Sequence, residues 1–334
     1  MQPHKVRIAL PSKGRMEGET LEFLANCGLR VNKTNPRQYS ASMPTFPDVQ
    51  VLFQRPRDIP SSIAAGDVDL GITGYDTVAE AAVDLDDMVI IHDALGYGEC
   101  ALVLAVPMIW QDVVSLDDLA MRARSETLRV ATKYERSVQR FLEQAGVEGV
   151  RIVHADGALE AAPSIGYADF IADITSTGTT LRENNLRPLE NGTVVKSQAV
   201  FIGNRAALAT RPEVLSVTEQ MLEFIEAYLQ ARGRYMIFAN MRGESIEDIA
   251  SRVLEQPDLG GLQWPTISPL VTGNQQANWW SINLVVPHHR LYAAIQQIRA
   301  IDGSGVVVTP VTYIFEERPA RCQRLLATVQ RQGK

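Results

Sequence analysis

The sequence predicts an α/β fold with a largely parallel sheet, followed by a smaller α+β domain. Three observations support this prediction. Up to about residue 205, short β-rich runs alternate with helical segments, as in strands connected by helices. From Tyr235 the expected order changes to strand, helix, strand, strand, helix, strand. At 334 residues the chain is also long for a single core, so its length favours two or three domains.

The strands of the first part are short apolar runs rich in Val, Ile and Leu. In chain order we expect them at Val6–Leu10, Val49–Phe53, Val68–Ile72, Met88–His92, Ala101–Val106, Leu128–Ala131, Arg151–His154, Phe170–Ile174 and Ala199–Ile202. The helices between them have readable ends. Glu17–Asn26 stops before Gly28, and Ser115 with Asp118 resembles a capping box that opens a helix at Leu116–Arg124.

The smaller domain is expected after the longest helix. Glu213–Arg232 has apolar residues at an approximate 3–4 spacing and ends at Gly233, so a boundary is expected there. The elements that follow are expected at Tyr235–Ala239, Ser245–Glu255, Thr266–Val271, Trp280–Val286, Arg290–Ile301 and Val306–Phe315. This order is that of a ferredoxin-like sandwich of about 80 residues. Glu316–Lys334 is expected to be a polar tail with some helical character.

Composition argues against several classes of protein. The hydrophobic fraction is 46%, and no run of about 18 apolar residues exists that could span a membrane. The net charge of 32 − 39 = −7 argues against a general nucleic-acid binder. The first residues lack an apolar signal core, and Cys27, Cys100 and Cys322 are an odd number at wide spacing. We therefore expect a cytoplasmic protein with reduced thiols.

The most informative stretch ends in a hydroxyl-rich loop, Asp173–Thr180. An apolar strand carrying Asp169 and Asp173 leads into the loop, and Leu181–Asn185 is expected to be helical. Strand, small-residue turn and helix together favour a phosphate-binding loop, in which Gly178 permits close backbone approach. The alternative is a capped helix after a buried strand. Since Asp169 and Asp173 are four residues apart on a strand, both could bind ribose hydroxyls, or Mg²⁺ through water.

Two further stretches place charged residues at expected strand ends. Lys13 and Arg15 follow the first strand, at the end where ligands bind in open α/β sheets. The simpler interpretation is a surface turn.

The second stretch carries Arg55 and Arg57 and continues at Asp69–Asp76, where Gly74 and Asp76 lie at an expected helix start. The simpler interpretation here is that Asp76 only caps the helix Thr77–Ala82. Neither stretch is decisive alone.

Taken in order, these motifs resemble ATP phosphoribosyltransferase, the family that commits phosphoribosyl pyrophosphate to histidine biosynthesis. The matching segments are Ile8–Arg15, Arg57–Pro60, Asp69–Asp76 with Glu80, Gly96–Gly98 with Cys100, Gly157–Pro163, Gly166–Leu181 and Gly261–Pro269. The ordered set is specific although no single piece is. One departure is Trp264, where the family commonly has a small residue.

The resemblance implies a domain organisation. Residues 1–105 and 195–233 would form the first of two periplasmic-binding-protein-like lobes, and residues 106–194 would form the second, with the active site between them. Residues 234–315 would form an ACT-like regulatory domain, and 316–334 a tail. This is the long form of the family, which assembles as dimers and hexamers.

The resemblance also implies a reaction. N1 of the ATP adenine would attack ribose C1 of phosphoribosyl pyrophosphate and release pyrophosphate, with Mg²⁺ present and with feedback inhibition by histidine. The residues implied for phosphoribosyl pyrophosphate are Glu160, Asp169, Asp173, Ser176, Thr177, Gly178, Thr179 and Thr180. Those implied for ATP or pyrophosphate are Lys13, Arg15, Arg55 or Arg57, Gly74, Asp76 and Tyr97. Tyr97 either stacks on adenine or is a core aromatic, and Thr266 would contact histidine.

Two other classes of protein remain open on sequence grounds. A solute-binding or sensor protein of the same two-lobed fold would carry an export signal or a DNA-binding N-terminal helix pair, and neither is evident. A catalytically silent regulatory protein would be expected to lose the charged residues of the site. The chain retains Lys13, Arg15, Asp169 and Asp173.

Overall fold

The structure is a computed structural model that describes residues 6–35, 38–81, 87–262, 264–271, 278–317 and 319–330. Residues 1–5 of the expected first lobe, Ala82 at the expected helix end and residues 331–334 of the expected tail lie outside these ranges. The chain divides into two compact units, Met1–Leu222 with Ala320–Lys334, and Glu223–Pro319. The first unit contains two α/β lobes.

Lobe I is built on a sheet with strand order β2-β3-β1-β4-β11-β5 in the described residues. The strands are β1 (Val6–Pro11), β2 (Ser40–Met43), β3 (Phe46–Gln54), β4 (Leu70–Gly74), β5 (Met88–His92) and β11 (Ala199–Asn204). β1 runs parallel to β3 and β4, and β11 runs antiparallel to β4 and β5. Every residue of β4 is buried, which explains its continuous apolar sequence.

The helices of lobe I connect these strands. They are α1 (Gly14–Asn26), α2 (Ile59–Ala64), α3 (Tyr75–Glu80) and α7 (Arg205–Thr210), with a short 3-10 turn at Pro56–Asp58. α1 begins earlier than expected, directly after Lys13. Both α1 and α3 therefore start at the carboxyl ends of parallel strands, the edge where ligands bind in such sheets.

Lobe II has the strand order β10-β6-β9-β7-β8 in the described residues. Its strands are β6 (Cys100–Pro107), β7 (Leu128–Thr132), β8 (Val150–His154), β9 (Phe170–Thr175) and β10 (Leu186–Ser197). Its helices are α4 (Leu116–Ser125), α5 (Glu135–Gln144) and α6 (Thr179–Glu183), with a 3-10 turn at Leu159–Ala161. The expected capping box is confirmed, because the Asp118 N–H donates to Ser115 Oγ and the Ser115 N–H donates back to the Asp118 carboxylate.

The chain crosses between the lobes at two adjacent segments. β6 pairs with β9 and β10 of lobe II along its length, so the first crossing lies before Cys100, not near residue 105 as expected. The return lies at Gln198, between β10 and β11. The two segments bond to each other, since Leu95 N–H donates to the Ala199 carbonyl and Ala199 N–H donates to the Tyr97 carbonyl.

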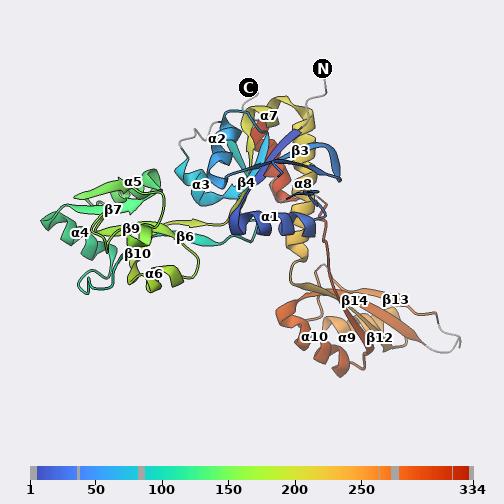
Figure 1. Ribbon diagram of the computed structural model, residues 1–334. Coiled ribbons are helices and arrows are strands. Elements are labelled where there is room, and N and C mark those ends of the chain that lie inside the picture. The colour runs from blue at the N-terminus through green and yellow to red at the C-terminus, as the bar shows by residue number, and fades with distance from the viewer. Residues whose placement is uncertain are drawn as a thin grey trace, which may run out of the picture. The chain divides into compact units, whose positions relative to one another are not determined.

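The second unit has the expected ferredoxin-like order. Its elements are β12 (Arg234–Arg242), α9 (Ile246–Leu254), β13 (Thr266–Pro269), β14 (Trp279–Pro287), α10 (His288–Ala300) and β15 (Ser304–Pro310). All pairings in its sheet β13-β14-β12-β15 are antiparallel, and α9 and α10 cover one face (Figure 1). β15 ends at Pro310, before the expected Phe315.

The longest helix, α8 (Pro212–Ala231), carries the boundary between the units. The division falls after Leu222 and inside this helix, whereas the sequence placed it after Gly233. Although α8 is long and apolar, no helix in the described ranges meets the length and hydropathy needed to cross a membrane.

The expected tail contains a helix, α11 (Ala320–Gln330), that belongs to the first unit. It packs against α7 and β5, and Leu325 is buried there. Arg321 forms an ion pair of 2.8 Å with Asp93, which follows β5. In Figure 1 this red helix lies among the blue elements of lobe I. The second unit is therefore inserted in the sequence between parts of the first.

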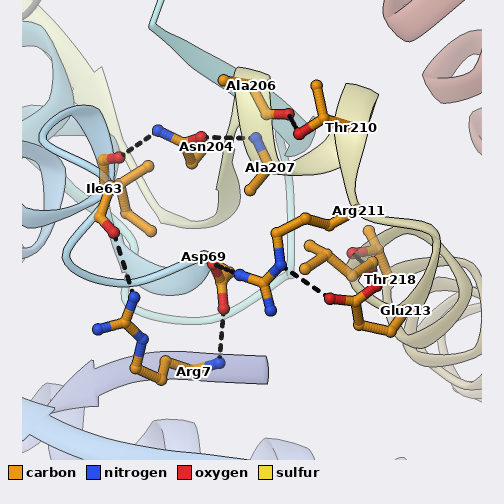
Figure 2. A network of polar contacts seen from close by, with 12 residues as sticks. Arg7, Ile63, Asp69, Asn204, Ala206, Ala207, Thr210, Arg211, Glu213 and Thr218 are labelled. Carbon is orange, nitrogen blue, oxygen red and sulfur yellow. Dashed lines mark hydrogen bonds and ion pairs between the residues drawn. The ribbon is translucent and has the colours of Figure 1, made fainter. Parts of the chain in front are cut away.

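A buried polar network fixes the amino end of β4 (Figure 2). Asp69 is only 2% exposed, and its carboxylate accepts hydrogen bonds from the Arg7 backbone N–H (2.8 Å) and from Arg211 Nη1 (2.6 Å). Arg211 Nε also donates to Glu213 (2.8 Å). Since both oxygens of Asp69 are used, the first residue of the Asp69–Asp76 motif ties β1, β4 and the start of α8 together.

Asn204 extends this network to the neighbouring helices (Figure 2). Its N–H donates to the Asp69 carbonyl at 2.8 Å, and its side-chain amide donates to the Ile63 carbonyl at 2.8 Å. Its side-chain oxygen accepts from the Ala207 N–H at 2.7 Å, which caps α7. Through its backbone and its side chain, this buried residue thus connects the residue before β4 with α2 and α7.

Candidate functional site

A cavity of about 720 Å³ lies in the first unit and is lined by residues of both lobes. Lobe I contributes residues from the carboxyl ends of β1, β3 and β4. Lobe II contributes residues that follow β7 and β8, together with Ile174 near the end of β9 and Cys100 at the start of β6. The described lining residues are Lys13, Met16, Arg55, Pro56, Arg57, Asp58, Gly74, Asp76, Thr77, Glu80, Ala81, Cys100, Lys133, Tyr134, Asp156 and Ile174. The structure therefore brings together Lys13, both candidate arginines, Gly74 and Asp76, as expected.

Four cationic side chains line this cavity, together with four acids, Asp58, Asp76, Glu80 and Asp156. Arg57 donates to Asp156 of lobe II at 3.2 Å. Lys13 and Arg55 are exposed, and their side chains have no hydrogen bond or ion pair with the residues that the structure describes. Of the two candidate arginines, Arg55 is thus the one whose guanidinium is available to an anion, while Arg57 joins the lobes.

Asp76 points into a buried network instead of capping α3. Ser197 Oγ donates to one carboxylate oxygen at 2.7 Å, and the Tyr134 hydroxyl donates to the other at 3.0 Å. Burial first, and then the nearby Asp76 charge, raise the pKa of Tyr134, so its hydroxyl keeps the proton that it donates. The expectation that Asp76 merely caps the helix is wrong, because Asp76 lies inside α3, whose N-cap is Gly74, and its carboxylate bonds to Ser197 and Tyr134.

A second cavity of about 490 Å³ adjoins the first, and Cys100 lines both. The hydroxyl-rich loop reaches this cavity through Thr175 and Ser176, opposite Lys196, Ser197 and Gln198 of the returning segment. Thr177, Gly178, Thr179 and Thr180 do not line it among the described residues. The first residues of the loop therefore face a space shared by both lobes.

The loop itself has an ordered geometry. Gly178 has φ +69° and is the N-cap of α6, and its N–H donates to Thr175 Oγ1 at 2.8 Å. Arg182 bonds to the Thr177 carbonyl and to Thr179 Oγ1, both at 3.2 Å. A cation and several hydroxyls thus surround a turn that requires the left-handed region, where glycine is favoured.

Asp173 lies at the carboxyl end of β9 beside a lysine that the sequence interpretation missed. Its carboxylate lies 3.7 Å from Lys133 Nζ, and it accepts the Ile174 N–H at 2.8 Å. Burial raises the pKa of Asp173, Lys133 opposes that shift, and Glu160 adds to it. Glu160 is therefore near Asp173, as expected.

Asp169 is held away from this group, which corrects the expectation that both acids serve one ligand. Arg129 donates its backbone N–H (2.7 Å) and its Nη2 (3.0 Å) to the Asp169 carboxylate. Burial would raise the pKa of Asp169, but these bonds from Arg129 lower it overall. Four residues of strand separate the two acids by roughly 13 Å along β9.

Lobe I contains an equivalent pair, Asp69 and Arg7. In both pairs the acid immediately precedes a strand that runs parallel to the strand of the arginine. In both pairs the acid's carboxylate also accepts the backbone N–H of the arginine. In each case the acid's own N–H donates to the arginine carbonyl, at 3.0 and 2.8 Å. Asp169 is therefore a structural acid at the amino end of its strand.

Two other expected site residues, Tyr97 and Arg15, interact with side chains of α1 in lobe I. The Tyr97 hydroxyl donates to Thr20 at 3.0 Å, and its ring lies 4.9 Å from that of Phe23. It lines neither described cavity, so the core interpretation of Tyr97 holds in this structure. Arg15 forms an ion pair with Glu19 on α1 (2.8 Å) and also lines neither cavity.

The donor set does not suit a metal ion held by protein alone. In the described residues, no three His, Cys, Asp or Glu side chains come together in a group that could bind one. Asp169, which precedes β9, and Asp173, inside β9, are the expected indirect ligands and lie roughly 13 Å apart along the strand. Mg²⁺ usually keeps waters and substrate phosphates as ligands. These residues therefore fit an ion that binds mainly to the substrates' phosphates.

Several residues of the site were not predicted from the sequence. They are Lys133, Tyr134, Asp156, Arg182, Lys196 and Ser197. Lys133 and Tyr134 follow β7 at its carboxyl end, the same signal that identified Lys13 after β1, so this pair could have been found. Asp156 follows β8 in the same way and could also have been found, whereas Ser197 could not, since only the fold brings it to the cavities.

In the second unit, Thr266 is exposed on β13 and pairs in register with Asn283 of β14. Trp264, which departs from the family pattern, is 75% exposed and has φ +89°. Its N–H donates to the Gly260 carbonyl at 3.0 Å.

Fold and site together define a two-lobed α/β enzyme whose cleft offers cations and hydroxyls to phosphorylated ligands. Comparison with known families makes this specific. A family model described as "ATP phosphoribosyltransferase" matches residues 55–227, and one described as "HisG, C-terminal domain" matches residues 231–313. The chain belongs to the ATP phosphoribosyltransferase family, whose members are enzymes of histidine biosynthesis.

Individual relatives agree. ATP phosphoribosyltransferase 2, chloroplastic, of Arabidopsis thaliana is 44% identical over 97% of this chain and 81% of the relative. The enzyme of Metallosphaera sedula is 33% identical over 93% of this chain and all of the relative. A solved ATP phosphoribosyl transferase (HisG:HisZ) complex from Thermotoga maritima matches with a TM-score of 0.51 and 28% identity, covering 66% of this chain and 98% of that one.

Proposed function

We propose that this enzyme transfers the phosphoribosyl group of phosphoribosyl pyrophosphate to N1 of ATP, which is the reaction that the family resemblance implies. A bond forms between N1 and ribose C1, the bond from C1 to the pyrophosphate oxygen breaks, and its electron pair leaves with pyrophosphate. The observation that carries the proposal is the cavity in which Lys13, Arg55, Arg57 and Lys133 converge from both lobes.

The division of labour follows from where the residues lie. The cations of the larger cavity would bind the polyphosphate of ATP and the departing pyrophosphate, where negative charge develops. The hydroxyl-rich loop would bind the 5-phosphate, and Asp173 the ribose hydroxyls. Holding both reactants between two lobes replaces a bimolecular encounter with an oriented one. We also propose that Mg²⁺ accompanies the substrate phosphates.

The direct test mixes pure protein with ATP, Mg²⁺ and phosphoribosyl pyrophosphate and follows the phosphoribosyl-ATP adduct by mass spectrometry. Formation of the adduct, dependent on both substrates, is expected. Arg55→Ala should lower its rate strongly, whereas Arg140→Ala, a matched loss of an exposed arginine on α5, should not. Absence of the adduct from wild-type protein that is folded would contradict the proposal.

We propose further that the second unit binds histidine near Thr266 and transmits inhibition. The supporting features are its ferredoxin-like sheet and the exposed position of Thr266 on β13, an edge strand of that sheet. Thr266→Ala should weaken histidine binding in calorimetry and raise the inhibitory concentration by the same factor. Typical coupling of about 1–3 kcal/mol corresponds to roughly 5–150-fold inhibition. Unchanged affinity would exclude Thr266.

Assembly and location are also proposals. A dimer or hexamer is proposed by family likeness, and light scattering after size exclusion would measure it. A reducing compartment such as the cytoplasm is supported by the odd number and wide spacing of Cys27, Cys100 and Cys322. The Arabidopsis relatives are named as chloroplastic, so localisation of a fluorescent fusion is the deciding measurement.

A further inference from the structure

Two acids on one face of α3, Asp76 and Glu80, reach from lobe I to lobe II. They are four residues apart, so they lie on the same side of the helix. Asp76 accepts the Tyr134 hydroxyl, as described above, and Tyr134 immediately precedes α5. Glu80 accepts two backbone N–H groups from the first turn of α5, Arg136 at 3.1 Å and Ser137 at 2.9 Å.

The Glu80 contact has a clear physical basis. The first N–H groups of a helix lack partners within the helix, and the amino end carries partial positive charge. The residue before α5, Tyr134, makes no side-chain cap bond. A carboxylate from the other lobe therefore performs the capping that the local sequence of α5 does not provide.

The Asp76 contact is the more buried of the two. Asp76 and Tyr134 are each 8% exposed, and Ser197, which donates to the same carboxylate, is 6% exposed. Ser197 ends β10, one residue before the return crossing at Gln198. The contact thus involves lobe I, lobe II and the crossing segment at once.

We propose that Asp76 and Glu80 position lobe II on lobe I through Tyr134 and the amino end of α5, and so set the shape of the cavity. We call these contacts the α3 brace. Its residues act through the arrangement of the lobes and not on the reacting atoms. Lys133 and Tyr134 line the cavity and lie directly before α5, so a shift of that helix would displace them. The inference rests on the proposed transferase function.

Kinetics should separate positioning from chemistry. If the contacts of the α3 brace are removed, a smaller fraction of molecules has the cavity in its substrate-binding shape. The apparent affinity for substrates then falls in proportion to that fraction. Glu80→Ala and Tyr134→Phe should each raise KM for both substrates by roughly 10- to 150-fold, the range expected for hydrogen bonds to a charged group. Saturating substrates reassemble the cavity, so kcat should stay within about twofold of wild type.

Amide hydrogen exchange supplies a readout that does not depend on activity. In Glu80→Ala the Arg136 and Ser137 amides lose their acceptor, and their exchange should accelerate by about tenfold or more. Glu80→Gln keeps an acceptor without the charge and should be intermediate in both exchange and KM. It also replaces Glu80→Ala if that variant folds poorly. Glu143→Gln is the matched control, because among the described residues the Glu143 side chain has its hydrogen bond within α5, from Gln139.

Two results would overturn the inference. In one, the α5 amides become exposed in Glu80→Ala while KM is unchanged, so the contact exists but positions nothing. In the other, kcat falls and KM stays constant, so these residues act in the chemical step. If wild-type protein forms no adduct, the proposed function fails, whereas the exchange measurement still tests the Glu80 contact with α5.

Discussion

Burial raises the pKa of Asp173, and Lys133 at 3.7 Å opposes that shift. In the proposed reaction the ionised form binds ribose hydroxyls as an acceptor, so activity should fall with decreasing pH at a higher value than for an exposed carboxylate. Lys133→Met removes the opposing charge and should move this acidic limb of log(kcat/KM) further upward. Lys133→Arg should retain the wild-type limb, and an unchanged limb in Lys133→Met would separate Lys133 from Asp173.

The raised pKa of Asp173 affects activity and folding stability in opposite directions: activity falls as pH decreases, whereas the free energy of unfolding falls as pH increases. A carboxyl whose pKa is raised in the folded state binds its proton more tightly there, so folding loses stability as pH rises through the window above the unfolded value. Asp173→Asn should therefore leave the free energy of unfolding at pH 7 unchanged or increased. Its KM for phosphoribosyl pyrophosphate should rise more than about tenfold. Urea unfolding and initial-rate kinetics on one preparation measure both effects.

Asp169→Asn is the natural comparison, because it removes the other acid of the same strand. Its kinetics should stay near wild type, while its melting temperature falls, since Arg129 lowers the pKa of Asp169 in the folded state. That contribution is present at neutral pH and is lost as pH falls through the lowered pKa. A large rise in KM for Asp169→Asn would return this residue to the site.

The buried pair Asp69 and Arg211 gives a third residue-scale prediction. Arg211→Met leaves a carboxylate that is 2% exposed without its cation, which should lower the free energy of unfolding by about 3–5 kcal/mol. Glu213→Gln alters only the half-exposed partner of Arg211 and should cost about 0–1 kcal/mol. Denaturant titration of both variants provides the measurement, and equal losses would contradict the account.

The sequence predicted those site residues whose position depends only on the strand or turn that contains them. Lys13 and Gly74 follow predicted strands, so the rule that ligands bind at the carboxyl edge identified them. Asp173 was identified because it lies near the end of the predicted strand Phe170–Ile174, directly before the hydroxyl-rich loop. Sequence reasoning placed Asp169 in the same site as Asp173 because both side chains project from the same side of a strand. That prediction was wrong, because two residues on one side of a strand can still lie far apart along it. Sequence reasoning could not find Ser197, which is 121 residues from Asp76 in the chain.

At the level of elements, the Gly178 turn offers the sharpest test. Gly178→Val places a branched side chain at φ +69°, with Arg182 Nη1 3.1 Å from the new Cβ, and should abolish turnover while the fold remains. Gly146→Val is the matched control: Gly146 has φ +66° and no atom within 4 Å of its added Cβ. Both variants should lose similar stability, and only Gly178→Val should lose turnover, measured at saturating substrates.

The strands that sequence reasoning missed differ physically from those it found. β2, Ser40–Met43, is short and polar, and it pairs at the edge of its sheet. β10, Leu186–Ser197, contains Pro188 and Gly192 and is interrupted by irregular register, so it shows no continuous apolar run. Central strands such as β4 were predicted because burial on both faces makes their sequence apolar throughout.

At the scale of the whole molecule, α11 affects the design of a truncation that removes the second unit, because α11 follows that unit in the sequence but belongs to the first unit. Truncation after residue 234 would also delete α11 and expose its contact on α7 and β5. Leu325→Ala should destabilise the docking of α11 by about 2–5 kcal/mol, up to the full docking free energy. Exposed Arg324→Ala should have an effect within about 0.5 kcal/mol. Amide exchange along α11 measures both, and equal protection in the two variants would contradict the assignment.

The order of synthesis gives α11 a further consequence. The residues that make up α7 and β5 leave the ribosome early, but their partner helix is made only after all of residues 223–319. During translation the surface that Leu325 covers therefore stays open to solvent and to other nascent chains, although N-terminal domains generally fold first. A chaperone that recognises apolar surface would have a binding site on the nascent enzyme that vanishes once α11 docks.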